Sequence, residues 1–317
     1  MKSNVTVVIP TRNRPQLVVR AVASALSQTY KVERVIVVVD GPDDATVSAL
    51  AAIEDPRLHT IVLPTSGGSN NARNRGAACA ASEWIAFLDD DDEWLPQKIE
   101  TQLASADLAD IVSCRFLSQT SQGATIWPRN LPGASEKFGD YLFSRRSIFN
   151  GEAAVITSTL LVRKAVFDQI PFSTILRRHQ DTDWVIRSIE KGARFFYAPE
   201  PLVQFNDDIG RTRISTSYDW RQSLDWIRSI RGFLGPRAYA GFVLTSVGSA
   251  ASDKRDWIAF RLLLREALAK GRPTGLHLAL YLGMWLFPQR MRQGVRAFLT
   301  RRPHHKFSRV LHNENRM

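Results

Sequence analysis

Four consecutive aspartates, Asp89–Asp92, directly follow the apolar run Trp84–Leu88. Neighbouring carboxylates repel one another, and the repulsion grows where the surroundings are less polar than water. A cation should therefore meet them, and Mg²⁺ or Mn²⁺ prefers oxygen ligands of this kind. The plainer interpretation is a solvated loop in which Asp90 or Asp92 caps a helix expected after Trp94. A cap needs only one aspartate, so the run predicts a metal–diphosphate site.

Three other polar segments carry residues suited to binding an activated phosphate compound. Pro10–Pro15 follows the first predicted strand, Asp40 ends the second, and Gly67–Gly76 opens a helix. In a parallel sheet, the carboxyl ends of the strands and the first turns of the following helices meet at one edge, where such sheets bind ligands. We therefore expect these segments to lie beside the four aspartates.

Alternating apolar runs indicate the elements that position these segments. Arg34–Val39 is almost purely valine and isoleucine, as expected for a parallel strand covered on both faces. Strand–helix alternation predicts the α/β class, with a mostly parallel sheet flanked by helices. The predicted strands are Val5–Ile9 (stopped by Pro10), Arg34–Val39, Leu58–Leu63 and Trp84–Leu88, and the predicted helices run through Leu17–Ala25, from Asp43, and over Ser69–Ala81.

The pattern loosens after a strand at Asp110–Cys114. Residues 115–150 show little periodicity and are expected to form an irregular segment that faces the substrate. Ala153–Val162 is expected to be a strand and Asp181–Glu190 a helix with Val185, Ile186 and Ile189 on its inner side, followed by short strands at Arg194–Tyr197 and Pro201–Phe205.

The net charge of +11 is unevenly distributed over the 317 residues. Residues 211–317 hold 20 Lys and Arg against 6 Asp and Glu, whereas the preceding residues are close to neutral. Such asymmetry suggests that one part of the chain meets a polyanion or an anionic membrane. Cys79 and Cys114 give neither a metal-binding spacing nor a disulfide framework, which favours a reducing compartment. Pro10 interrupts the first apolar run after too few residues for a signal peptide, so this run fits a first strand better.

From about residue 218 the sequence predicts basic helices. The apolar segment Leu276–Phe287 is too short to cross a bilayer, which takes about 20 residues. Arg272 precedes it, and further arginines follow at positions 290, 292 and 296. This arrangement suits a helix seated at the surface of an anionic membrane. A helix buried against its neighbours explains the pattern equally well.

Four ordered motifs together resemble glycosyltransferase family 2, the inverting enzymes with a GT-A fold. They are "VVIPTRNRP", "VIVVVDGPDD", "ARNRGAACAASEWIAFLDDDDEW" and "RHQDTDWVIRSIEKG", and the resemblance covers roughly residues 4–207. The resemblance implies a GT-A (Rossmann-like) catalytic domain over residues 1–215 and a basic helical region over 216–317. It also implies a nucleotide-sugar donor, most simply a UDP-sugar, and a glycan or lipid-linked glycan acceptor in cell-surface polysaccharide synthesis. The enzyme would be cytoplasmic and peripheral on the cytoplasmic face of the inner membrane.

The resemblance also assigns roles to individual residues. Asp91 would hold Mn²⁺ or Mg²⁺, and the residues expected to contact the nucleotide sugar are Pro10, Thr11, Arg12, Asp40, Arg73, Asp89 and Asp90. Each has an ordinary alternative: Thr11 could cap a helix, Asp40 could be a turn residue, and Arg73 could pair with a surface carboxylate.

The later motif, His179–Trp184, corresponds to the family segment that supplies the general base. Asp181 aligns with that base, which takes the proton of the attacking acceptor hydroxyl. Gln180 stands where the family usually has Glu, which removes a neighbouring negative charge and leaves the base less basic. Asp183 is expected to orient the motif or cap its helix, and His179 to be a packed or surface histidine.

Two further segments complete the expected site. Arg211 and Arg213 lie where related enzymes carry a mobile lid, and they would close on the diphosphate. A flexible linker between domains is the alternative for this segment. Thr157–Thr159 would shape the acceptor pocket.

Two rival functions remain open from the sequence. A nucleic-acid-binding protein would explain the sequence pI of about 10.0, but the basic helices carry no recognisable binding motif, and no nucleic-acid partner is expected. A sugar-phosphate nucleotidylyltransferase would share the architecture. It would need a Gly-rich loop after the first strand, and Pro10–Pro15 contains no glycine.

Overall fold

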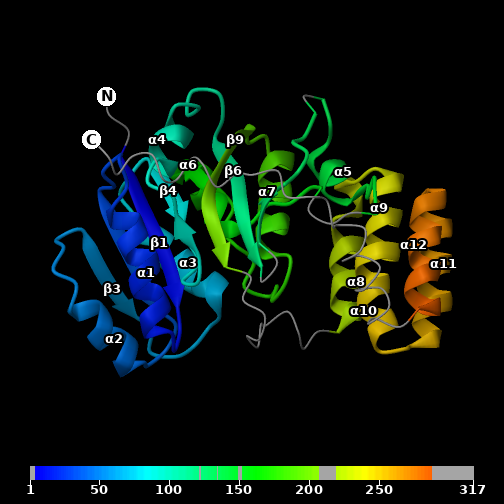
Figure 1. The fold of residues 1–317 in the computed structure, drawn as a ribbon, viewed down its shortest axis with the longest axis horizontal. Coiled ribbons are helices and arrows are strands. Elements are labelled where there is room, and N and C mark those ends of the chain that lie inside the picture. Colours follow the sequence, from blue (N-terminus) through cyan, green and yellow to red (C-terminus); the bar gives the residue numbers. More distant parts are fainter. Residues whose placement is uncertain (1–3, 121–122, 134, 149–151, 207–218, 288–317) are drawn as a thin grey trace.

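The computed structural model describes residues 4–120, 123–133, 135–148, 152–206 and 219–287 (Figure 1). Within these ranges nine strands form one sheet in the order β3-β2-β1-β4-β8-β6-β9-β5, with β7 paired to β6. The strands are β1 (Val5–Thr11), β2 (Arg34–Val39), β3 (Leu58–Val62), β4 (Trp84–Phe87), β5 (Glu93–Trp94), β6 (Ile111–Thr120), β7 (Gly123–Trp127), β8 (Leu161–Arg163) and β9 (Phe195–Asn206).

The first half of the sheet is the predicted parallel one. Strands β3, β2, β1 and β4 all run in the same direction. The prediction that Pro10 stops β1 was wrong, because β1 continues to Thr11. Its pairing with β4 ends at Val8, whose carbonyl accepts from Leu88 N. The N–H that Pro10 lacks therefore falls beyond the end of that ladder, where it costs no strand bond.

Helices cover both faces of the sheet. They are α1 (Pro15–Leu26), α2 (Asp44–Ala51), α3 (Ser69–Ala78), α4 (Lys98–Leu103), α5 (Phe138–Phe143), α6 (Lys164–Gln169) and α7 (Gln180–Glu190). Val7 and Ile9 of β1 belong to the hydrophobic cluster that contains the inner face of α1. Val8, between them, belongs to the cluster that contains α7, as the alternation of side chains along a strand requires.

The second half of the sheet differs from the prediction in three places. The segment expected to be irregular contains the end of β6, strand β7 and helix α5. Most side chains of β7 are exposed, so this strand lacks the apolar alternation that would have revealed it. The strand expected over Ala153–Val162 is instead a 3₁₀ turn at Thr157–Thr159 followed by β8. The two short strands expected after α7 are one strand, β9, which pairs with β6 across a register shift at Arg115.

The C-terminal region is helical, as predicted, and lies together at one side of the sheet (Figure 1). It comprises α8 (Trp220–Ser229), a 3₁₀ turn (Arg231–Phe233), α9 (Pro236–Phe242), a π-helical stretch (Val243–Val247), α10 (Gly248–Asp253), α11 (Trp257–Lys270) and α12 (Gly275–Leu286). These helices share one hydrophobic cluster with α7 and β4. In the part of the chain that the structure describes, every helix is too short or too polar to span a bilayer.

Candidate active site

The acidic cluster, Asp89–Asp92, leaves the carboxyl end of β4 and meets the loop after β1. Thr11 Oγ1 donates to Asp90 Oδ2 at 2.8 Å, so Thr11 does not cap α1. Arg14 Nη1 donates to Asp90 Oδ1 at 2.8 Å and to Asp91 Oδ2 at 3.2 Å. Arg14 is thus one of the cations that the cluster requires, and its part in the site was missed in the sequence.

Asp40, at the end of β2, fastens the loop that leads into α3. Its carboxylate accepts from Ser66 Oγ at 2.7 Å and from the backbone N–H groups of Gly67 and Gly68 at 2.8 and 2.9 Å. Gly68 has φ of 88°, a conformation that glycine adopts without strain. Arg12 Nη1 donates to the same Ser66 hydroxyl at 2.7 Å. Asp40 therefore does more than an ordinary turn residue, because it sets where α3 begins.

Arg73 connects the acidic cluster to the later motif. Arg73 is only 4% exposed, and its Nη2 lies 2.5 Å from Asp89 Oδ1. Nη1 donates to Gln180 Oε1 at 3.2 Å, in the first turn of α7. A Cβ on Gly76 would lie 2.5 Å from Val8 Cγ1, so Gly76 lets α3 approach the sheet closely enough for this bridge. The carboxylate that Arg73 pairs with is thus a member of the acidic cluster, and the pair is buried on the arginine side.

Asp92 is buried beneath the cluster. Ser158 Oγ donates to Asp92 Oδ2 at 2.5 Å, while Asp92 Oδ1 has no partner among the described residues. Desolvation, with the charges of Asp89 and Asp91, raises the pKa of Asp92 well above its ordinary value. Neither Asp90 nor Asp92 caps the next helix, because α4 begins at Lys98 after Gln97. Ser158 comes from the turn expected to shape the acceptor pocket, but it supports the acidic cluster.

Asp90 carries the other perturbed carboxyl of the cluster. Burial raises its pKa to about 6, and the positive charge of Arg14 and the hydrogen bond from Thr11 oppose that rise. By contrast, the side chains of Asp89 and Asp91 are 32% and 30% exposed. Asp89 and Asp91 are therefore the carboxylates that an incoming ligand can reach, each beside an arginine, whereas Asp90 is buried.

Asp181, the predicted base, lies in the first turn of α7. Its Oδ1 accepts from Thr182 N at 2.8 Å. Desolvation raises the pKa of Asp181, the negative charge of Asp89 raises it further, and the positive charge of Arg73 lowers it. Since Arg73 contacts both Asp89 and Gln180, the residue before Asp181, the two predicted motifs face each other in one site. A carboxylate with a raised pKa at such a place is suited to accept a proton.

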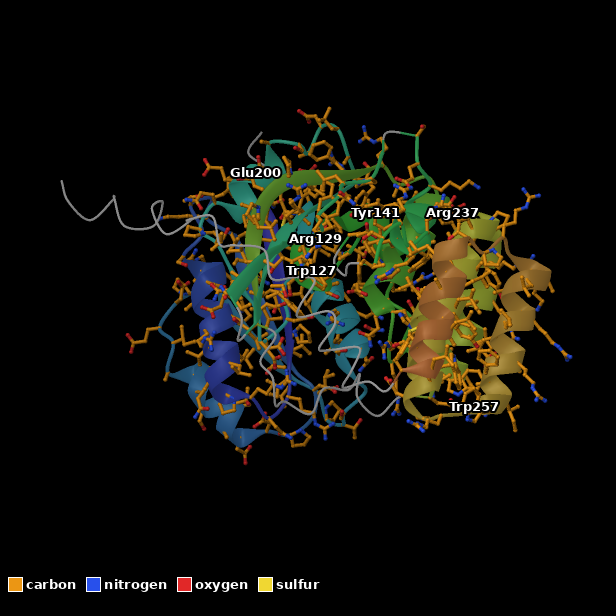
Figure 2. The ribbon with its side chains drawn as sticks, turned by 45° about the vertical axis from the view of Figure 1, so that its right-hand side comes forward. Trp127, Arg129, Tyr141, Glu200, Arg237 and Trp257 are labelled. Carbon is orange, nitrogen blue, oxygen red and sulfur yellow. The ribbon has the colours of Figure 1, made fainter. Side chains whose placement is uncertain are left out.

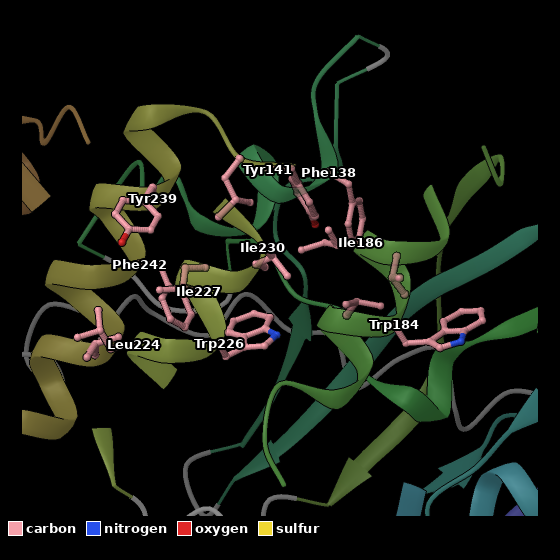
Figure 3. Packing of buried hydrophobic residues seen from close by; sticks show 14 of the residues in the cluster. Phe138, Tyr141, Trp184, Ile186, Leu224, Trp226, Ile227, Ile230, Tyr239 and Phe242 are labelled. Atoms are coloured by element: carbon pink, nitrogen blue, oxygen red, sulfur yellow. The ribbon is translucent and has the colours of Figure 1, made fainter. Parts of the chain in front are cut away.

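Helix α8, from the C-terminal helical region, packs against α7 (Figure 3) and contacts its first turn. The ring of His179 stacks on Trp226 with centroids 4.3 Å apart, and His179 Nε2 hydrogen-bonds Ser223 Oγ. Trp226 Nε1 donates to Asp183 Oδ1 at 3.0 Å. Desolvation lowers the pKa of His179 to about 3, so this packed histidine is neutral. Asp183 orients α7 instead of capping it.

The donor set fits a divalent ion that is shared with a substrate. Within the described ranges, no group of three or more His, Cys, Asp or Glu side chains is arranged to hold a metal by itself. Mg²⁺ is commonly held by one or two carboxylates together with substrate phosphates and water. Asp89 and Asp91 supply such carboxylates, and Arg14 supplies a positive charge beside them. The residues fit a cation completed by a diphosphate and do not form a protein-only cage.

The remaining predicted site residues fall outside this cluster of contacts. Pro10 is buried within β1 and offers only its backbone carbonyl and ring. Arg211 and Arg213 lie outside the described residues, as does the lid expected there.

The sequence matches the model of "Glycosyl transferase family 2" over residues 6–171. It is 31% identical over 230 residues to the putative colanic acid biosynthesis glycosyl transferase WcaA of Escherichia coli strain K12, which covers 68% of this chain and 78% of that protein. It is 41% identical over 106 residues to the succinoglycan biosynthesis protein ExoO of Rhizobium meliloti strain 1021. That match covers 33% of this chain and 30% of ExoO, so the chain spans less than a third of that relative.

Among solved structures, the fold is similar to residues 1–349 of S. aureus TarS in complex with UDP-GlcNAc. The TM-score is 0.60 at 18% identity, and the similarity covers 92% of each chain. This similarity confirms the predicted GT-A-like α/β architecture with helices after the sheet.

Proposed function

Because this chain belongs to glycosyltransferase family 2, we propose that it moves a sugar with inversion from a UDP-sugar to a glycan or lipid-linked glycan acceptor during cell-surface polysaccharide synthesis. Two relatives are named for colanic acid and succinoglycan biosynthesis, which supports this class of acceptor. TarS, which has a similar fold, is described with UDP-GlcNAc, which supports a UDP-linked donor.

The observation that carries this proposal is the bridge made by Arg73. It joins Asp89, at the edge where a parallel sheet binds ligands, to the first turn of the helix that presents Asp181. Donor and acceptor must meet within a few ångströms for an in-line transfer. A buried arginine that fixes both edges provides this geometry before substrates bind.

On the donor side, the diphosphate would approach the open carboxylates Asp89 and Asp91 together with Mn²⁺ or Mg²⁺. When bound, the ion neutralises the charge that develops on the departing diphosphate. Arg14 adds positive charge beside Asp91. The nucleoside pocket would be lined by Thr11, Arg12 and Asp40, because their hydrogen bonds fix the position of the loops around it.

On the acceptor side, Asp181 would take the proton of the hydroxyl as that oxygen attacks the anomeric carbon. The bond between the anomeric carbon and the diphosphate oxygen breaks as the new glycosidic bond forms, so the configuration inverts. The base works only when deprotonated, so the positive charge of Arg73, which lowers the pKa of Asp181, keeps it active to lower pH. Gln180 stabilises Arg73 without adding a second negative charge.

Three parts of the proposal concern regions beyond these contacts. Residues 1–215 would form the catalytic domain and 216–317 the basic helical region. Arg211 and Arg213 would close on the diphosphate as a lid. The enzyme would work in the cytoplasm, peripherally on the inner membrane.

A thermal-stability screen tests the donor and the metal together. We expect one UDP-sugar to raise the melting temperature, and Mn²⁺ to increase that rise. Asp91→Ala should abolish the increase caused by Mn²⁺, while Asp107→Ala, an exposed aspartate away from the site, should not. Asp181→Asn should keep the stabilisation and lose sugar transfer. Equal Mn²⁺ effects in wild type and Asp91→Ala would contradict the proposed metal ligand.

A further inference from the structure

The outward face of α11 is apolar where a surface helix is ordinarily polar. Six of its exposed positions recur at helical spacing and so form one stripe: Trp257, Ile258, Arg261, Leu262, Arg265 and Leu268. Exposed Ala269 and Lys270 follow at the end of the helix. Ile258 is 81% exposed and Trp257 is 58% exposed. A stripe of aromatic and aliphatic side chains interrupted only by arginines needs a partner that is both apolar and anionic.

The same face forms a groove of about 750 Å³ with no free acid in it. Its lining includes Trp257, Ile258, Leu262, Arg261 and Arg265. Within the described part of the chain, neither Arg261 nor Arg265 makes a hydrogen bond or ion pair. The acid in the lining, Glu266, is already bound by Arg228, Tyr239 and Lys270. The groove therefore presents positive charge that the protein does not neutralise.

The stripe lies beside the end of α12, because Trp257 packs against Trp285 with ring centroids 5.2 Å apart. Leu282, Leu286 and Phe287 are 45%, 70% and 51% exposed. Seven of the twelve exposed large apolar side chains in the described residues lie between positions 257 and 287. This concentration distinguishes the face from the isolated apolar residues that any protein surface carries.

Trp257, at the start of α11, lies at the same lower end of the molecule as the carboxyl end of β1. Figure 1 shows β1 running downward from the N-terminus, so the carboxyl end of β1 lies toward the lower side. Figure 2, turned only about the vertical axis, shows Trp257 at the lower end of the helical region.

We infer that the α11 face, meaning the six stripe residues of α11 with Leu282, Leu286 and Phe287, docks on the surface of an anionic phospholipid bilayer. Aromatic and aliphatic side chains would enter the boundary between headgroups and acyl chains, while the arginines meet lipid phosphates. Two other candidates for binding the α11 face, a second copy of the chain and residues 288–317, would bring positive charge against its arginines. A second copy would bring arginines against arginines, and residues 288–317 hold eight Lys and Arg against one Glu.

This inference extends the peripheral location of the proposed function to named residues on α11. Its test measures lipid binding without turnover, so failure of docking and failure of sugar transfer can be told apart.

Co-sedimentation of the full-length protein with vesicles tests the inference. The vesicles contain phosphatidylcholine alone or phosphatidylcholine with 30% phosphatidylglycerol. We expect binding to the anionic vesicles at low salt that weakens in high salt. Arg261→Gln and Arg265→Gln should each weaken binding about five-fold. Ile258→Ser with Leu262→Ser should also weaken it, because the apolar contact is lost.

Matched controls lie on other surfaces. Arg237→Gln, on the opposite end of the helical region in Figure 2, and Ile175→Ser, 90% exposed, should bind vesicles like wild type. Circular dichroism and melting temperature verify that each variant is folded. Equal binding by the α11 variants and wild type would overturn the inference. So would a wild-type dimer in the absence of lipid that Ile258→Ser converts to a monomer, since the face would then join two copies.

Discussion

Replacing Arg73 tests the bridge between the two edges of the site. Its guanidinium makes four side-chain hydrogen bonds, to Ser69, Asn70, Gln180 and Asp89. Breaking a buried ion pair by removing one partner costs about 3–5 kcal/mol. Asp89 is partly exposed and can be rehydrated, so Arg73→Met should cost about 3 kcal/mol, the lower end of that range. Arg73→Lys keeps the positive charge but lacks the planar guanidinium with its several N–H donors. It should lower the free energy of unfolding by about 2 kcal/mol through lost hydrogen bonds.

The same two variants separate charge from geometry in catalysis. Both should lower kcat, because neither Met nor Lys spans from Asp89 to Gln180. Only Arg73→Met removes the positive charge that lowers the pKa of Asp181. When the pKa of the base is raised, a smaller drop in pH is enough to protonate the base and stop catalysis. The acidic limb of kcat against pH should therefore move to higher pH in Arg73→Met and stay close to wild type in Arg73→Lys.

Urea unfolding at pH 7.5 and sugar transfer between pH 5 and 9 provide the two measurements. Arg57→Met is the matched control, because Arg57 pairs with Asp55 away from the site. It should leave the pH profile of kcat unchanged. An Arg73→Met variant with wild-type stability, or with an unmoved acidic limb, would refute the assignment of Arg73 as the bridge.

Three other substitutions have defined outcomes. Lys98→Met should stabilise the protein by about 1–2 kcal/mol at pH 7, measured by urea unfolding. Burial lowers the pKa of Lys98 from 10.5 to about 8, so keeping this side chain charged costs the folded state about 3 kcal/mol. The variant removes that cost but also loses the hydrogen bond to Gln102, which reduces the gain. The cost of the charge is complete below pH 8 and disappears as the pH rises toward 10.5, so a gain that persists at pH 10.5 would contradict the buried charge. Trp226→Phe keeps the aromatic packing but removes the hydrogen bond to Asp183 Oδ1. Initial rates should therefore show a lower kcat with an unchanged KM for the donor. A rise in KM alone would contradict the role of Trp226 in positioning α7. Gly76→Ala should destabilise by about 1–3 kcal/mol in urea, because its Cβ meets Val8; a neutral result would show that α3 can shift.

The parallel half of the fold could be predicted because its signals are local. Val35–Val39 is covered on both faces and is therefore apolar, and the predicted bounds Arg34–Val39 are those of β2. Pro10 misled the prediction, because the end of a neighbouring strand decides whether a proline is tolerated, and single-strand patterns do not contain that information. Strand β7 and the turn at Thr157–Thr159 were missed for a similar reason, since their positions depend on partners distant in sequence.

The acidic cluster and the base motif could also be found in the sequence, because charge repulsion and motif order point to them. The sequence predicted that a cation must meet the four aspartates. It did not reveal that Arg14 does so from the start of α1 and Arg73 from within α3. Arg14 stands directly before Pro15 at the start of α1, so its role depends on the approach of β4, which only the folded sheet provides.

The most direct test follows the sugar itself. With the α-linked UDP-hexose chosen by the stability screen and water in place of the acceptor, proton NMR records the anomeric proton of the released sugar before mutarotation. Inverting transfer through Asp181 predicts that the β-anomer appears first, and that Asp181→Asn releases none although it still binds the donor. Initial release of the α-anomer, or an Asp181→Asn variant as fast as wild type, would contradict the account.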